Sequence, residues 1–200
     1  MSSTTQSIGL ATFRYEERGF AHRAVKVLPG EFYVADDETP IVTVLGSCVA
    51  VCLRDSTIGV GGMNHFLLPD GGDSGLADSA GRYGVNAMEM LINELVKRGA
   101  VRRRLEAKIF GGGQVMRNFT SLNVGERNAE FTKNFLRTED IPIVSEDLLD
   151  VHPRKVCFIA KTGRAFVKKL AAVEPSLVQQ ERQYQKTLVS KPVAGDIELF

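Results

Sequence analysis

The chain has 200 residues, 44% of them hydrophobic and 24% charged, a composition ordinary for a globular domain that can bury a core without a disulfide or metal staple. Its 25 lysines and arginines nearly balance 24 aspartates and glutamates, so the net charge of +1 creates no field that would draw the chain to nucleic acid or to a membrane. Three cysteines, an odd number, argue against a disulfide framework and favour a reducing, cytoplasmic setting.

The chain divides by composition into three parts. We expect a partly disordered N-terminal segment over 1–25, a folded domain over 26–172, and a tail over 173–200 that contains a helix and ends in a strand. The N-terminal sequence MSSTTQSIGL lacks the basic segment and apolar run of a secretory signal. No apolar run approaches the roughly 20 residues that a membrane span requires, so we expect no membrane insertion.

The densest apolar run of the chain, residues 42–69, predicts a strand, a tight corner at 46–47 and a hairpin. Residues 48–53 form one apolar, β-branched arm of the hairpin, and 58–68 resume the pattern after turn-prone Asp, Ser and Thr. Before this run, Pro-Gly at 29–30 predicts a turn that leads into another strand.

A helix is clearest over 82–98, because apolar residues recur there at intervals of three and four. Gly99 can occupy the position that follows its last turn. The stretch before this helix, 70–81, is rich in Gly, Asp and Ser and predicts a long loop, either a connector or a functional segment. The helical residues that we expect to face the core are Val85, Met88, Leu91, Ile92 and Leu95.

Short strands and one further helix follow. Strands are predicted over 105–110 and 141–144, with a helix over 126–137 between them. Residues 155–161 and 164–170 predict a second hairpin. Because hairpins are frequent and strands do not alternate regularly with helices, we expect an α+β fold, with a mixed or antiparallel sheet and flanking helices in a single domain.

Cys48 opens one arm of the first predicted hairpin, and His65 lies near the end of the other. If Ser56 and Thr57 are the central turn pair, cross-strand partners have numbers that sum to 113, as Cys48 and His65 do. Directly opposed side chains share a face with β-carbons roughly 4.5–5.5 Å apart, close enough for a nucleophile and its base. The glycine pair after the turn could hold a bulge, and a one-residue slip would send one side chain to the opposite face.

The corner before Cys48 is a second reason to single out this thiol. Gly46 and Ser47 let the backbone turn sharply, and N–H groups at such a corner can face a developing oxyanion. A thiol beside a protonated imidazole has a lowered pKa and becomes a thiolate nucleophile. On the residues alone, two readings stay open: a catalytic pair, or a buried structural cysteine beside a satisfied histidine.

The remaining histidines and cysteines give weaker signals. We expect His22 and His152 at the surface, because they lie in polar or loop segments, and Cys157 in the core. Cys52 shares a strand face with Cys48. Together with His65 these two thiols would supply three ligands, whereas a zinc site needs about four, so we expect Cys52 to be a packed neighbour.

Five segments together resemble the CheD family of bacterial chemotaxis. They are, in chain order, LGSCVAVCL at 45–53, GGMNHFLLP at 61–69, SAGRYGVNAMEML at 79–91, EAKIFGGG at 106–113 and NVGERN at 123–128. Members of this family are chemoreceptor glutamine deamidases. The resemblance therefore implies a cysteine hydrolase that converts selected glutamines of methyl-accepting chemoreceptors to glutamate and releases ammonia.

The resemblance also implies roles and partners. It places the nucleophile at Cys48, the base at His65 and the third catalytic residue at Thr43, and it implies neither a metal nor a cofactor. The implied partners are the chemoreceptors and, for some members, a CheC-type phosphatase. Two other functions stay open: a non-catalytic chemotaxis binding module, and a receptor glutamate methylesterase, since the same acyl chemistry serves esters.

Overall fold

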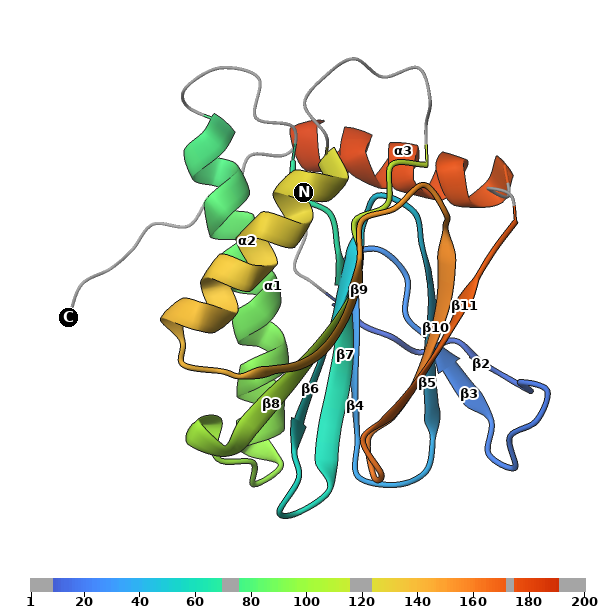
Figure 1. Ribbon diagram of the computed structural model, residues 1–200, viewed down its shortest axis with the longest axis vertical. Coiled ribbons are helices and arrows are strands. Elements are labelled where there is room, and N and C mark those ends of the chain that lie inside the picture. The colour runs from blue at the N-terminus through green and yellow to red at the C-terminus, as the bar shows by residue number, and fades with distance from the viewer. Residues whose placement is uncertain (1–8, 70–75, 116–123, 172–174, 191–200) are drawn as a thin grey trace, which may run out of the picture.

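The computed structural model describes residues 9–69, 76–115, 124–171 and 175–190. Within them two β-sheets pack face to face, helices cover the outer face of one sheet, and a last helix lies across one end of the pair (Figure 1). This arrangement confirms the predicted α+β fold with mixed sheets.

In the described part of the chain, the larger sheet has six strands in the order β1-β4-β7-β6-β8-β9. Their bounds are Gly9–Leu10 for β1, Glu31–Ala35 for β4, Val49–Asp55 for β6, Val60–Phe66 for β7, Leu105–Gly111 for β8 and Ile143–Leu148 for β9. The smaller sheet, within the same residues, orders five strands as β11-β10-β5-β3-β2. Their bounds are Arg14–Tyr15 for β2, Ala24–Lys26 for β3, Pro40–Leu45 for β5, Arg154–Ile159 for β10 and Arg164–Lys169 for β11.

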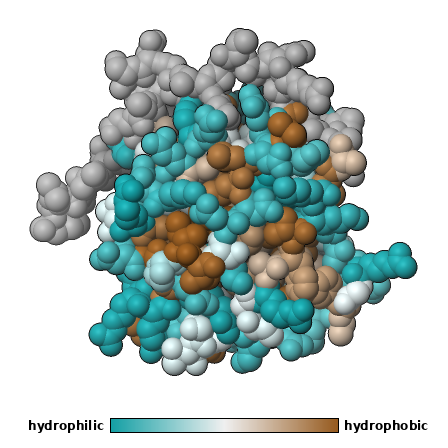
Figure 2. All heavy atoms as spheres, in the orientation of Figure 1, coloured by the Kyte–Doolittle hydropathy of each residue, from teal (hydrophilic) through white to brown (hydrophobic). Residues whose placement is uncertain are grey.

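Helices α1 (Leu76–Lys97) and α2 (Val124–Thr138) pack on the outer face of the larger sheet, and α3 (Pro175–Ser190) lies across the sheet ends (Figure 1). A short 3₁₀ helix, η1 (Arg102–Arg104), leads into β8. In the view of Figure 2, hydrophobic atoms form separate patches surrounded by hydrophilic residues. None of the helices that the structure describes is long and apolar enough to cross a membrane.

Strand β6 is buried on both faces, which explains why its sequence reads as one apolar run rather than an alternation. Its odd-numbered side chains from Val49 to Leu53 pack against α1 and α2. Its even-numbered neighbours, Ala50 and Cys52, point the other way into the core between the two sheets, and Cys48 lies in that core with them. The candidate thiol therefore belongs to the layer between the sheets.

The predicted hairpin is confirmed as β6 and β7, but its predicted register is wrong. Ala50, rather than Cys48, lies opposite His65. The turn spans residues 56–59 instead of a central pair, so the pairing is shifted by two residues. Because the side-chain period of a strand is also two, this shift leaves Cys48 and His65 on the same face of the sheet.

The loop predicted over 70–81 is wrong for its second half, because α1 already begins at Leu76, and the rest lies outside the described residues. Asp, Ser and Gly within 76–81 interrupt the apolar pattern and hide this helix start in the sequence. Further along α1, Gly84 lets the two helices approach closely, since a Cβ there would collide with Phe131 of α2. Val85, predicted to face the core, is 43% exposed, whereas the other four predicted core residues of the helix are buried.

Most later elements lie where the sequence predicted them. Strand β8, helix α2 and the β10–β11 hairpin differ from their predicted ends by at most two residues, and β9 begins and ends later than predicted. Helix α3 confirms the helix in the tail, whereas the predicted final strand over 196–200 lies outside the described residues. Residues 9–25 contain β1, β2 and the start of β3, and so contribute to both sheets.

Candidate active site

Cys48 lies at the corner between β5 and β6, where three glycines at the end of β8 fix the backbone. Gly112 N–H donates to the Cys48 carbonyl oxygen at 2.7 Å, and Gly113 N–H donates to that of Gly46 at 2.8 Å. Gly111 has a φ of 110°, which favours glycine, and a Cβ there would collide with the Cys48 carbonyl. The carbonyls of Gly46 and Cys48 are therefore bound to the end of β8, whereas the N–H groups of residues 46–48 can bind a partner from outside the sheet.

Helix α2 adds a second tie to this corner through Asn128, whose side chain is fully buried. Its Nδ2 donates to the Ser47 carbonyl oxygen at 2.9 Å, and its Oδ1 accepts from Leu68 N–H at 2.9 Å. One amide group thus joins the corner before Cys48 to the chain that follows β7. Asn128 therefore positions the corner by binding its backbone.

Asn128→Ala is expected to lower the free energy of unfolding by about 1–3 kcal/mol, because it leaves two buried backbone groups without their partner. Denaturant unfolding at neutral pH measures the change. The matched control is Asn134→Ala on the exposed side of the same helix, which should stay within about 0.5 kcal/mol of the parent. Equal stability of Asn128→Ala and the parent would contradict the positioning role.

His65, near the end of β7, meets Thr43 of β5 across the layer between the sheets. Thr43 Oγ1 and His65 Nδ1 are 2.8 Å apart, and both residues are 1% exposed. The Thr43 hydroxyl donates its single proton to the Val27 carbonyl oxygen at 2.7 Å, so it can only accept from the ring. Because the Val27 carbonyl, also an acceptor, lies 3.4 Å from Nδ1, the ring proton belongs on Nδ1.

This tautomer makes Nε2 the basic nitrogen of His65. Among the described residues Nε2 has no hydrogen-bond partner, although it is buried. Burial lowers the pKa of His65 from 6.5 to about 4, and the opposing effects of Glu181 and the Val27 carbonyl are smaller. The imidazole is therefore neutral at neutral pH, and its free lone pair can accept a proton.

A carboxylate from α3 fills the space in front of the corner N–H groups. Glu181 is 3% exposed. Its Oε1 accepts from Gly46 N–H at 3.0 Å and from Cys48 N–H at 3.4 Å, and its Oε2 accepts from Ser47 N–H at 3.3 Å and from the Ser47 hydroxyl at 2.8 Å. A Cβ on Gly46 would lie 2.9 Å from Oε1, so glycine leaves room for the carboxylate. Successive N–H groups that converge on one anion form an anion-binding nest.

The same arrangement keeps Cys48 protonated. Burial of the fully enclosed thiol, then the charge of Glu181 and a hydrogen bond with its carboxylate, raise the pKa of Cys48 well above its usual value. A thiol, unlike a thiolate, is a poor nucleophile. Removal of the carboxylate would take away two of the three causes that raise this pKa.

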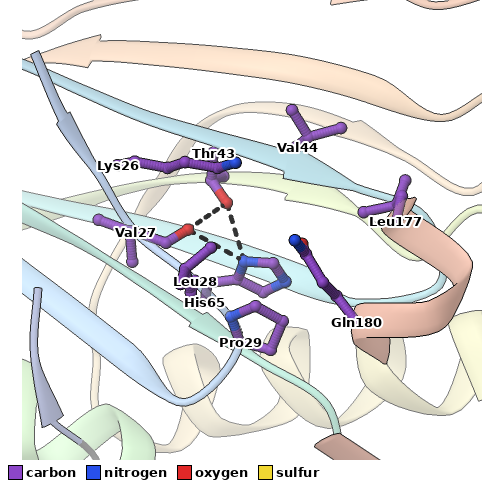
Figure 3. A pocket seen from close by; sticks show the side chains of 9 residues that line it. All are labelled: Lys26, Val27, Leu28, Pro29, Thr43, Val44, His65, Leu177 and Gln180. Atoms are coloured by element: carbon purple, nitrogen blue, oxygen red, sulfur yellow. Dashed lines mark hydrogen bonds between the residues drawn. The ribbon is translucent and has the colours of Figure 1, made fainter. Parts of the chain in front are cut away.

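A small pocket opens beside the imidazole of His65 (Figure 3). It encloses about 50 Å³, enough for a water molecule. Residues of β5, the 27–29 segment and α3 line it, and the side chain of Gln180 extends from α3 toward the ring. Helix α3 therefore covers both parts of the site, the nest at Cys48 and the pocket at His65.

Of the three sequence-predicted residues, the structure brings Thr43 and His65 into contact and places Cys48 in the same layer between the sheets. Thr43 is hydrogen-bonded to His65, and the charge of Glu181 acts on both His65 and Cys48. We call this region, with the nest of N–H groups over 46–48, the thiol–imidazole site.

The other histidines and cysteines lie where the sequence predicted them. His22, 3.9 Å from Glu38, and His152 are exposed, whereas Cys52 and Cys157 are buried free thiols. Within the described residues, no group of three or more His, Cys, Asp or Glu side chains could hold a metal ion.

Sequence reasoning missed two residues of the site, Gln180 and Glu181, and singled out Asn128 only as part of the NVGERN segment. Asn128 lies on the helix of the NVGERN segment, where its polar side chain is buried. For Glu181 the usable signal is its spacing from Leu177 and Tyr184, which puts a carboxylate in the middle of an apolar helix face.

Comparison with known proteins gives consistent names. The family model that matches residues 67–169 is described as CheD chemotactic sensory transduction. A protein of Thiobacillus denitrificans named probable chemoreceptor glutamine deamidase CheD is 57% identical over 194 residues, 96% of each chain. A protein of the same name from Janthinobacterium sp. (strain Marseille) is 56% identical over 194 residues, 95% of each chain. Among solved structures, the hypothetical protein YfiH of Bacillus licheniformis aligns with 73% of this chain and 65% of its own, at 14% identity and a TM-score of 0.40.

Proposed function

The chain belongs to the CheD family, and we propose that it is a chemoreceptor glutamine deamidase, a hydrolase that converts receptor glutamine side chains to glutamate and releases ammonia. The observation that carries this proposal is Nε2 of His65, which has no hydrogen-bond partner among the described residues and lies on the same sheet face as Cys48 and its nest of N–H groups. The names of both relatives specify deamidation, which favours this activity over a non-catalytic binding module or a methylesterase.

In the proposed mechanism Cys48 is the nucleophile and His65 the general base. Nε2 of His65 takes the thiol proton, and the thiolate attacks the carboxamide carbon of a receptor glutamine. The N–H groups of 46–48 stabilise the resulting oxyanion, and their binding of the Glu181 carboxylate supports this role. His65 then returns its proton to the leaving nitrogen, so that ammonia departs and a thioester remains.

A water molecule completes the reaction. The pocket that His65 helps to line can hold one. The hydroxide attacks the thioester carbon, the carbon–sulfur bond breaks, and the Cys48 thiolate recovers its proton from His65. Every step uses side chains and backbone groups of the chain itself, and the mechanism requires no metal or cofactor.

Thr43→Val is expected to lower kcat/KM for receptor deamidation roughly tenfold, because the ring of His65 loses a hydrogen bond worth about 1.4 kcal/mol that holds its tautomer. Thr43→Ser restores the hydroxyl and should recover most of the activity. Initial rates measured across pH distinguish a change in the base from a general loss of fold. Equal kcat/KM values for the valine and serine variants would show that the hydroxyl of residue 43 has no catalytic role.

The function is tested by incubating the protein with chemoreceptor and mapping the receptor glutamines by mass spectrometry. We expect the mass gain of an amide NH₂ replaced by OH at specific glutamines, with release of ammonia in equal amount. Methylated receptor, assayed for methanol, tests the esterase alternative in parallel. Receptor binding without any change at a glutamine would overturn the proposal and favour the binding module.

We assign catalysis to residues 26–172 and place it in the cytoplasm, with chemoreceptors as the substrate and a CheC-type phosphatase as a second candidate partner. The three cysteines are all free thiols, which supports a reducing compartment. Affinity measurements with purified receptor and with a CheC-type phosphatase test the two partners separately.

A further inference from the structure

Helix α3 turns one face toward the sheets, and a carboxylate interrupts that face near its middle. The residues of this face recur at intervals of four, three and four, and are Leu177, Glu181, Tyr184 and Leu188. Leu177 is 6% exposed, and Tyr184 and Leu188 are partly buried against the core. An apolar residue at 181 would continue this packing, so packing alone does not account for the glutamate.

Burial of a carboxylate is costly unless its oxygens are bound. At Glu181 four neutral donors bind them, and all four belong to the corner formed by Gly46, Ser47 and Cys48. The carboxylate is thus held by the groups that, in the proposed mechanism, hold the oxyanion of the substrate. The carboxylate also forms a hydrogen bond with the side chain of Cys48, the proposed nucleophile.

Glutamate is the side chain that deamidation produces, and its carboxylate would be left beside Cys48 in the same nest. We propose that α3 occupies the substrate site of this enzyme, with Glu181 bound as a product side chain, so that a helical receptor segment must displace α3 to bring its glutamine to Cys48. This inference rests on the proposed deamidase function. The fit of α3 shows that the surface accepts a helix, which supports a helical receptor segment with a glutamine as its competitor.

Contacts of the Tyr184 side chain also hold α3 in place. The hydroxyl of Tyr184 is hydrogen-bonded to that of Tyr83 on α1. A Cβ on Gly30, the residue of the turn before β4, would overlap the Tyr184 ring. These contacts are made by the Tyr184 side chain, which is not a reacting group, so its truncation weakens them without removing Cys48, His65 or Glu181.

The first test replaces Glu181, the product side chain, by glutamine, the substrate side chain. In Glu181→Gln the amide oxygen can accept from Gly46 and Cys48 N–H, and the amide NH₂ can donate to the Ser47 hydroxyl, while the weaker bond from Ser47 N–H at 3.3 Å is lost. The enzyme should then deamidate its own residue 181: thiolate adds to the amide carbon, ammonia leaves with a proton from His65, and water hydrolyses the thioester to restore Glu181. Peptide mapping of the purified variant should show glutamate at 181.

The double variant Cys48→Ala, Glu181→Gln should keep glutamine at 181, which separates enzymatic from spontaneous deamidation. Gln179 and Gln183 are exposed on the same helix and serve as internal controls that should stay unchanged in every sample. If residue 181 remains glutamine while the same preparation deamidates receptor, α3 does not occupy the substrate site. If neither residue 181 nor receptor glutamines are converted, the deamidase function fails with it.

The second test needs no receptor. Glu181→Ala removes the carboxylate, and Tyr184→Ala loosens α3 without removing a reacting group, so both should make alkylation of Cys48 by iodoacetamide severalfold faster. Gln183→Ala, at an exposed position of the same helix, should alkylate like the parent. Both faster variants should also deamidate receptor faster at low receptor concentration, where displacement of α3 limits the rate. Alkylation of Cys48 at the parent rate in both variants would overturn the proposal.

Discussion

Cys48→Ala should abolish receptor deamidation, with a loss of about 10⁴-fold or more, because alanine cannot form the thioester on which the reaction depends. The measurement is the conversion of receptor glutamines by mass spectrometry over a time course. Receptor binding should persist, since the variant removes one sulfur atom from a buried position and leaves the surface unchanged.

The matched control is Cys52→Ala. Cys52 is 1% exposed and lies in the same layer between the sheets, so its loss imposes a similar packing defect without removing the proposed nucleophile. This variant should deamidate receptor at close to the parent rate. Normal activity in Cys48→Ala would show that another group attacks the amide, and equal loss in both variants would show that the loss comes from the packing defect.

His65→Gln should lower kcat for receptor deamidation by about 10²–10⁴-fold, the usual contribution of a general base. Glutamine can still meet Thr43 and fill part of the ring volume, so the fold should be retained. Alkylation of Cys48 should slow as well, since no base is left to take its proton. His152→Gln, at an exposed position far along the chain, is the control that should leave the rate unchanged.

The same variant tests the titration of His65. Its pKa is about 4 in the folded protein and 6.5 in a model peptide, so the unfolded chain binds a proton more readily. His65 therefore costs no stability above about pH 6.5, and stability is lost as the pH falls from there toward 4. The melting temperature of the parent should fall more steeply over this pH range than that of His65→Gln. Parallel curves would mean that His65 is not buried as a neutral ring.

The face of each hairpin residue could be predicted from the sequence, but the register could not. Alternation along a strand fixes the face because the period is two, and the core between the sheets requires Ala50 and Cys52 to point inward together. The register depends on the turn, and the residues at 56–59 suit a four-residue turn as well as a two-residue one. The shift of two residues followed from that ambiguity.

The thiol and imidazole could be found from the sequence because the chain contains few such residues, and a resemblance to a family supplied Thr43. Glu181 could not be found in that way, since it lies more than a hundred residues beyond Cys48 in a polar tail. Only the docking of α3 brings it to the nest. A contact of this range depends on tertiary packing, which no local pattern reports. The start of α1 was missed for a local reason, because small residues mask the helical period.

Thr43 belongs to the smaller sheet and His65 to the larger one, so the hydrogen bond that selects the basic nitrogen is a joint between two separately hydrogen-bonded layers. Its length is set by the filling between them, where Met63 and Phe158 are fully enclosed. Densely packed interiors pass on small displacements instead of absorbing them. The kcat of this enzyme should therefore depend on the packing between its two sheets. It should decline when that packing is slightly loosened, well before the chain begins to unfold.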